Sequence, residues 1–253
     1  MDRTERFDEK NYEFNSDSKN GIYLIHGFTN TTHEIKGLAK YLSEKGYRTI
    51  ANNLPGHGTT IQECNRIKYA DWLQAVEQDV AKLAAQCDTI HIIGSSMGGV
   101  LALHLAAMFP INSLVVVAPV FQFKSEFKTR ILVPLFKNLI PTKNKASQYK
   151  NGKSMKFYGY TDYPNKALDE FRKLTNIVRK DIVQVKCPTL GIYSYGDQTC
   201  IMKNKDIVND NITSKIKETL VLDKISHNML VENHYLDEFE LVYNTIHQFI
   251  GRF

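Results

Sequence analysis

Residues 89–99 read TIHIIGSSMGG, an apolar run that leads into a serine flanked by glycines. Residues 89–93 have the near-continuous apolar character of a strand that helices cover on both faces. A helical pattern begins at Met97, so residues 94–98 fit the pattern G-x-S-x-G between a strand and a helix. The turn is so tight that side chains at Gly94 and Gly98 would collide. We therefore interpret Ser96 as a nucleophile at a helix N-terminus, where developing negative charge is favoured.

Short apolar runs alternate with helical patterns along the chain, which is typical of βαβ units around a parallel sheet. The predicted strands are residues 22–25, 47–51, 89–93, 114–118, 189–194 and 219–222. The predicted helices are residues 33–45, 70–86, 97–109, 165–179, 202–208 and 236–250. We therefore expect an α/β fold, a mostly parallel sheet with helices on both faces. The alternation breaks between residues 120 and 163, where no clean strand is evident, and a long insertion of this kind is more often functional than idle.

A second motif, His26-Gly27-Phe28-Thr29, follows the first predicted strand. Acyl transfer at a serine needs two backbone N–H groups aimed at the oxyanion. One comes from the residue after the nucleophile, here Met97, and the other from a loop after an early strand, here Phe28. We weighed His26 as a base and favour a structural hydrogen-bonding role for it.

A serine nucleophile also needs a histidine base that a carboxylate orients, in the chain order Ser, Asp or Glu, His. Three histidines lie late enough: His227, His234 and His247. Only His227 sits in a loop directly after a predicted strand, whereas the other two fall in or beside the last helix, so His227 is the predicted base. For the acid, Asp197 follows the strand 189–194 and is preferred to Asp223, which ends the strand that presents the base itself.

The amino-acid composition limits the class of protein, its compartment and its ligands. The chain has 253 residues, 43% apolar and 23% charged, which suits a globular domain. Residues 1–17 lack the apolar core of a signal peptide, and no run approaches the roughly 20 apolar residues of a membrane span, so we expect a cytoplasmic protein. Four cysteines without close pairing disfavour a zinc site or a disulfide framework. The net charge of +5 gives no reason to expect nucleic acid.

With these pieces in place, the chain resembles a bacterial carboxylesterase of the monoacylglycerol lipase-like branch of the α/β-hydrolase superfamily. The matching pieces are HGFTN at residues 26–30, LPGHG at 54–58, Asp71-Trp72, GSSMGG at 94–99, the turn at 194–197 and the His227 loop. The resemblance implies ester hydrolysis through a covalent acyl-serine, with no cofactor or metal. By position it implies Ser96, Asp197 and His227 as the triad and Phe28 and Met97 as oxyanion donors. One departure is Ser226, where such proteins commonly have glycine.

The resemblance also implies a core of residues 1–119 and 164–253 with a small helical cap inserted at 120–163. In that insertion six apolar residues recur at helical spacing, Ile131, Leu132, Leu135, Phe136, Leu139 and Ile140. We expect this face to cover an acyl pocket, with Leu132, Leu135, Phe136 and Leu139 as substrate-binding residues. The alternative is that the face only packs the cap onto the core.

A basic cluster lies in the same insertion. Residues 124–156 hold nine lysines and arginines against one acidic residue, Glu126. The cluster is interpreted either as a solvated lysine-rich face, which we favour, or as a weak contact with anionic lipid.

The function predicted from the sequence is thus hydrolysis of short- to medium-chain acyl esters. A monoacylglycerol lipase, a thioesterase, an acyltransferase or a carbon–carbon bond hydrolase stays open, because fold and triad are shared among them. A third class is a non-catalytic binder that keeps the pocket. Serine at position 96 disfavours enzymes with an aspartate nucleophile. The expected partner is a small-molecule ester, and both a monomer and a homodimer remain open.

Overall fold

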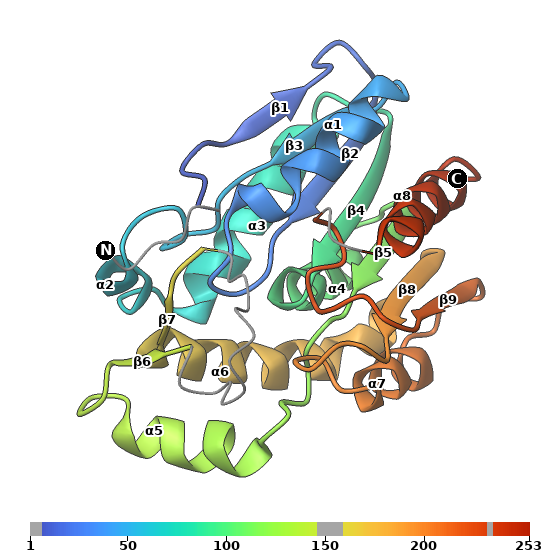
Figure 1. The fold of residues 1–253 in the computed structure, drawn as a ribbon. Coiled ribbons are helices and arrows are strands. Elements are labelled where there is room, and N and C mark those ends of the chain that lie inside the picture. Colours follow the sequence, from blue (N-terminus) through green and yellow to red (C-terminus); the bar gives the residue numbers. More distant parts are fainter. Residues whose placement is uncertain (1–6, 146–158, 232–234) are drawn as a thin grey trace.

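The computed structural model describes residues 7–145, 159–231 and 235–253, which form one seven-stranded sheet with helices on both faces (Figure 1). The strand order is β1-β3-β2-β4-β5-β8-β9, with β1 antiparallel to β3 and every other pair parallel. The strands are β1 (Tyr12–Phe14), β2 (Asn20–Ile25), β3 (Arg48–Ala51), β4 (Thr89–Ser95), β5 (Ser113–Val117), β8 (Thr189–Ser194) and β9 (Lys217–Leu222). The α/β fold expected from the sequence is confirmed.

The main helices are α1 (Lys36–Glu44), α3 (Tyr69–Ala84), α4 (Met97–Met108), α6 (Asn165–Asp181), α7 (Lys203–Asn211) and α8 (Leu236–Ile250). In Figure 1, α1 and α8 cover one face of the sheet, and α3 and α4 the other. The Tyr41 hydroxyl of α1 donates to Asn244 Oδ1 of α8 over 3.0 Å, which ties the first pair together. Among the described helices, none combines the length and apolar character needed to cross a bilayer.

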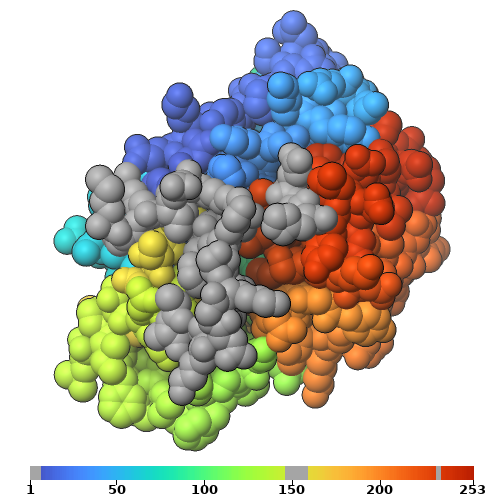
Figure 2. All heavy atoms as spheres, viewed as in Figure 1, coloured from blue at the N-terminus to red at the C-terminus, as the bar shows by residue number. Residues whose placement is uncertain are grey.

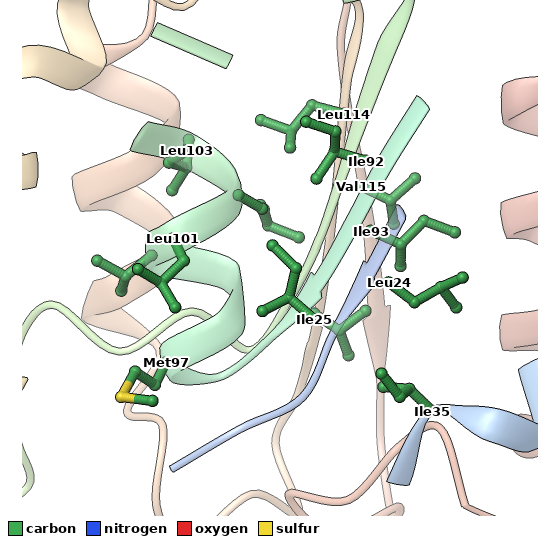
Figure 3. Close-up of a cluster of buried hydrophobic side chains, with 14 of the residues drawn as sticks. Leu24, Ile25, Ile35, Ile92, Ile93, Met97, Leu101, Leu103, Leu114 and Val115 are labelled. Atoms are coloured by element: carbon green, nitrogen blue, oxygen red, sulfur yellow. The ribbon is translucent and has the colours of Figure 1, made fainter. Parts of the chain in front are cut away.

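The core fills the space between the sheet and these two helix layers. Strand side chains alternate between faces, and Figure 3 shows Ile92 pointing toward α4 while Ile93 points to the opposite face. Both are buried, as is Leu101 of α4. Because α4 is apolar almost all the way round, it is enclosed on all sides, and its N-terminus is held in a fixed place at the end of β4.

Several short elements, among them β1, α2 (Ile61–Cys64) and β6 (Thr142–Asn144), were not predicted from the sequence. β1 reads YEF, an edge strand of three residues that depends on its pairing with β3, where Arg48 forms an ion pair with Glu13. The helix α2 is a single turn that Thr60 caps. The expectation of no strand between residues 120 and 163 was wrong at β6 and at β7 (Asp162–Pro164), which begins inside that range. The sequences TKN and DYP have no apolar alternation.

The described part of the insertion begins beyond β5 and lies over α6. It holds a π-helical turn, η2 (Lys128–Leu132), then α5 (Val133–Phe136) and β6, which pairs antiparallel with β7 (Asp162–Pro164). Figure 1 shows α6 between the sheet and α5, so the insertion forms an outer layer. Lys137 and Asp169 form an ion pair that fastens α5 to α6. The domain boundaries at residues 119 and 164 stay a prediction.

Candidate active site

The nucleophile turn lies at the carboxyl end of β4. Ser96 is the N-cap of α4 and has φ +54° and ψ −114°, a conformation that is strained for a residue with a side chain. Its backbone N–H donates to Val117 O over 2.8 Å, which anchors the turn to β5. Ser96 is 6% exposed, so its hydroxyl stands at the edge of the core. Backbone strain of this kind is commonly kept at functional sites, where the surrounding structure holds it.

Glycine is required on both sides of this serine. A Cβ atom on Gly94 would lie 2.1 Å from the carbonyl oxygen of Gly98. A Cβ atom on Gly98 would lie 2.2 Å from the carbonyl oxygen of Ile25, at the end of β2. Both contacts are with backbone, which cannot move aside as a flexible side chain can. The strand, the helix and the loop after β2 therefore converge within contact distance of Ser96.

The predicted base and acid meet at the same edge of the sheet. His227 follows β9 and Asp197 follows β8, and His227 Nδ1 lies 2.6 Å from Asp197 Oδ2. Asp197 Oδ1 accepts from the backbone N–H groups of Thr199 and Cys200 over 2.7 and 2.9 Å. These bonds aim the carboxylate at the imidazole. Because Nδ1–H is then the donor to Asp197, Nε2 is left as the free base.

The charge environment favours the protonated form of His227. Burial of the ring opposes that form, but the charge and hydrogen bond of Asp197, together with the charge of Glu34, outweigh it and raise the pKa of His227 above its ordinary value. Ser96 and His227 share no hydrogen bond in the described part of the chain, as is common for catalytic groups without substrate. The other histidine considered in the described range, His247, packs edge-on against Tyr47. Tyr47 directly precedes β3, so it lies at the amino ends of the parallel strands, whereas His227 and Asp197 lie at their carboxyl ends. His234 lies outside the described residues.

The two predicted oxyanion donors stand beside the nucleophile. Met97 is the first residue of α4, so its N–H has no partner within the helix. Neither this N–H nor that of Phe28 makes a hydrogen bond within residues 7–145, 159–231 and 235–253. Two amides without acceptors, one on each side of the turn, are available to a developing oxyanion.

The loop that carries Phe28 is held by two buried histidines. His26 Nε2 accepts from Leu54 N–H over 3.0 Å, and His57 Nε2 accepts from Thr29 N–H over 3.1 Å. Burial lowers the pKa of both rings, so they stay neutral and keep the acceptor nitrogens that these bonds need. His26 therefore has the structural role that the sequence favoured. The same loop contacts the loop of the predicted base, because Asn30 Nδ2 donates to Asn228 Oδ1 over 3.3 Å and Asn228 directly follows His227.

The four predicted substrate-binding residues lie on the insertion, which occupies the lower left of Figure 2. Leu135 is 67% exposed and Leu139 is 78% exposed, and Phe136 is exposed as well. Leu132 is half-buried. Their role as the wall of an acyl pocket stays a prediction. An aromatic group lies nearer to the loop of residues 26–30, the oxyanion loop, which is predicted to bind the oxyanion. The centroid of the Phe28 ring is 5.5 Å from that of Phe171 of α6, and the Phe171 centroid is 5.3 Å from that of Phe123.

Two charged side chains near the site were not predicted. Lys145 is buried, and its Nζ donates to Thr29 Oγ1 over 2.6 Å, so the insertion contacts the oxyanion loop. Burial lowers the pKa of Lys145 to about 7. Glu34 is 1% exposed and accepts hydrogen bonds from Gly27 and Ser95. Thr29 lies 116 residues from Lys145, and Ser95 lies 61 residues from Glu34, so no local pattern points to either side chain.

The sequence is similar to those of known hydrolases. Residues 16–234 match a protein family described as Serine aminopeptidase, S33. A thermostable monoacylglycerol lipase of Bacillus sp. (strain H-257) is 29% identical over 82% of each chain. A carboxylesterase of Bacillus subtilis (strain 168) is 24% identical over 91% of this chain and 92% of its own.

Solved structures show the same fold. The structure reported for the metagenome-derived lipolytic enzymes LipS and LipT superposes with a TM-score of 0.85 at 22% identity, over 97% of this chain and 98% of the other. The monoacylglycerol lipase of Paleococcus ferrophilus gives a TM-score of 0.74 at 14% identity, over 95% of this chain and 97% of its own.

Proposed function

This chain belongs to the Serine aminopeptidase, S33 family of α/β hydrolases, and we propose that it is a serine carboxylesterase for short- to medium-chain acyl esters. The observation that carries the proposal is the 2.6 Å contact between His227 and Asp197 at the sheet edge where Ser96 stands on its strained turn. An activated serine between two unoccupied backbone amides is what acyl transfer requires.

The proposed cycle uses the same groups in its acylation and deacylation halves. Ser96 Oγ attacks the ester carbonyl carbon as His227 Nε2 takes the hydroxyl proton, and Asp197 stabilises the imidazolium. The N–H groups of Phe28 and Met97 bind the oxyanion. The carbon–oxygen bond to the alcohol then breaks, and His227 protonates the leaving alkoxide. Water, deprotonated by His227, attacks the acyl-serine, and the acid leaves as Ser96 regains its proton.

The acyl group is proposed to be apolar. Phe28, Phe123 and Phe171 form an apolar group beside the amide that binds the oxyanion, and apolar contacts of this kind stabilise an alkyl chain by about 0.8 kcal/mol per buried CH₂. Monoacylglycerols are one candidate class, since a relative that covers most of the chain is a monoacylglycerol lipase. Activity on p-nitrophenyl esters of rising chain length measures the preference.

Other chemistries on the same triad are separated by substrate. A thioesterase hydrolyses acyl thioesters faster than the matching oxygen esters, and an acyltransferase gives an ester in place of the acid when an alcohol is added. The family description names an aminopeptidase, so an aminoacyl-p-nitroanilide belongs in the same panel. A non-catalytic binder turns over none of these substrates.

The test of the proposed function is the Ser96→Ala variant. We expect p-nitrophenyl butyrate turnover to fall by at least about 10⁴-fold, because the covalent route is lost and only binding and the oxyanion site remain. The melting temperature should stay close to that of the wild type or rise, since the Ser96 hydroxyl makes no capping hydrogen bond to α4. Wild-type turnover in a folded Ser96→Ala protein would remove the serine from the mechanism.

We further propose that the insertion rests weakly on anionic lipid. Phe127, Leu135 and Leu139 are largely exposed on it, and the exposed Lys128 and Lys143 lie in the same segment. An apolar face flanked by cations fits the headgroup region of such a bilayer. Co-sedimentation with vesicles of phosphatidylcholine and phosphatidylglycerol should exceed that with phosphatidylcholine alone, and Leu135→Asp with Leu139→Asp should abolish it. If the same amount of protein sediments with both vesicle types, the basic cluster is a solvated face and the lipid proposal is wrong.

The proposed compartment is the cytoplasm. Cys64, Cys87, Cys187 and Cys200 are all free thiols in the structure, as is usual where glutathione and thioredoxin keep thiols reduced.

A further inference from the structure

Glu34 is a buried carboxylate that bonds to both halves of the site. It ends the short helix η1 (Thr32–Glu34) and is 1% exposed. Its Oε2 accepts from the backbone N–H of Gly27 over 2.6 Å, and its Oε1 accepts from the Ser95 hydroxyl over 2.9 Å. The contact with Gly27 has the short length of a charge-assisted bond to an ionised carboxylate.

Both donors adjoin reacting groups. Gly27 precedes Phe28, an oxyanion donor in the proposed cycle, and Ser95 precedes the nucleophile. A Cβ atom on Gly27 would lie 3.1 Å from Ser96 Cβ and 3.3 Å from Glu34 Oε2. A side chain on Gly27 would therefore crowd both Ser96 and the carboxylate, so the oxyanion loop packs closely against each of them.

The charge of Glu34 is kept inside the protein at a cost. Across the described ranges, no lysine or arginine forms an ion pair with it, so its two hydrogen bonds replace its lost water. A buried charge without a cation opposes folding, and polar groups that oppose folding are commonly kept for function.

We propose that Glu34 is a positioning residue of the esterase site: it fixes the oxyanion loop against the nucleophile turn and adds a second negative charge to that of Asp197. The inference rests on the proposed function, which it deepens. Because the charge of Glu34 adds to the effect of Asp197 in raising the pKa of His227, it contributes to the pH at which the imidazole becomes a free base.

The Glu34→Gln variant separates charge from geometry. Its amide oxygen still accepts from Gly27 N–H, and its NH₂ group donates to the Ser95 oxygen, so both contacts persist while the charge is lost. We expect the acid limb of the kcat/KM profile for p-nitrophenyl butyrate to move to lower pH by roughly half a unit. KM at the optimum should change by less than about 2-fold, since no contact with substrate is removed.

The Glu34→Ala variant removes both contacts as well. Here kcat should fall on the order of 10-fold or more, because the oxyanion loop is no longer held, with the same displaced acid limb. Glu77→Gln is the matched control. Glu77 Oε1 lies 2.7 Å from His104 Nε2 on α4, and Glu77 has no part in raising the pKa of His227. The acid limb of the Glu77→Gln profile should therefore coincide with that of the wild type.

The outcomes are distinguishable. If Ser96→Ala is inactive but folded Glu34→Gln keeps the acid limb of the wild type, the proposal for Glu34 is wrong and the proposed function stands. This holds even where Glu34→Ala does not fold, because Glu34→Gln alone decides the role of the charge. If Ser96→Ala retains turnover, the proposed function and the role of Glu34 are both overturned.

Discussion

His227 Nδ1 lies 2.6 Å from Asp197 Oδ2, and this contact joins the loops that follow two neighbouring strands, β9 and β8. The pairing fixes the imidazole with Nε2 free and places a buried carboxylate where an imidazolium would form. It brings together residues 30 positions apart in the sequence at the edge where β4 presents Ser96.

The first prediction concerns the acid. Asp197→Asn keeps the size of the side chain but removes its charge and presents an NH₂ group, which favours the other imidazole tautomer. In a serine protease with the same kind of triad, the corresponding change lowers kcat about 10⁴-fold. We expect a loss of that order for p-nitrophenyl butyrate, measured by steady-state kinetics on protein whose melting curve is cooperative.

Asp223→Asn is the matched control for this change. Asp223 lies four residues before His227, but its side chain is exposed and makes no contact with the imidazole in the described structure. Its kcat/KM should stay within about 2-fold of the wild type. A large loss at Asp223 with little loss at Asp197 would reverse the assignment of the acid.

The pH dependence of activity follows from the raised pKa of His227. The neutral imidazole is the base, so kcat/KM falls as the pH drops through this pKa. Because Asp197 and Glu34 raise it, the midpoint of the acid limb should lie above the ordinary histidine value of about 6.5. A midpoint below 6.5 in the wild type would contradict the raised pKa.

Lys145 should make stability depend on pH. Burial lowers its pKa to about 7, while an unfolded lysine titrates near 10.4. Between these values the unfolded chain binds more protons, so the free energy of unfolding should rise with pH, by up to about 1.4 kcal/mol per unit from this group. Lys145→Met lacks this contribution. Between pH 7 and pH 9, the free energy of unfolding in urea should increase by roughly 2 kcal/mol more for the wild type than for the variant.

The exposed Lys128 provides the control, because Lys128→Met should leave the pH dependence of unfolding as it is in the wild type. Parallel stability curves for wild type and Lys145→Met over that range would show that Lys145 is charged in the folded protein at pH 9.

Local signals made much of the architecture predictable. β4, β8 and β9 are apolar runs that end in the loops of Ser96, Asp197 and His227, so strand ends could be found without knowing which strands pair. The carboxyl ends of parallel strands share one edge of the sheet, and this rule alone predicts that the three side chains gather there.

Contacts between distant segments could not be predicted. Glu34 lies 61 residues from Ser95, and Lys145 lies 116 residues from Thr29, and neither charge belongs to a pattern in its own segment. The apolar spacing around Leu135 and Leu139 identifies a helical face but not the direction in which it points, because an outward face and an inward face have the same period.

Covalent labelling with a fluorophosphonate measures whether Ser96 is an activated nucleophile. Folded wild-type protein is incubated with a fluorophosphonate and the labelled peptide is found by mass spectrometry. We expect one adduct per chain, on Ser96, that forms more slowly in Asp197→Asn and is absent from Ser96→Ala. If folded wild-type protein takes no label, or takes it on another residue, Ser96 is not the nucleophile.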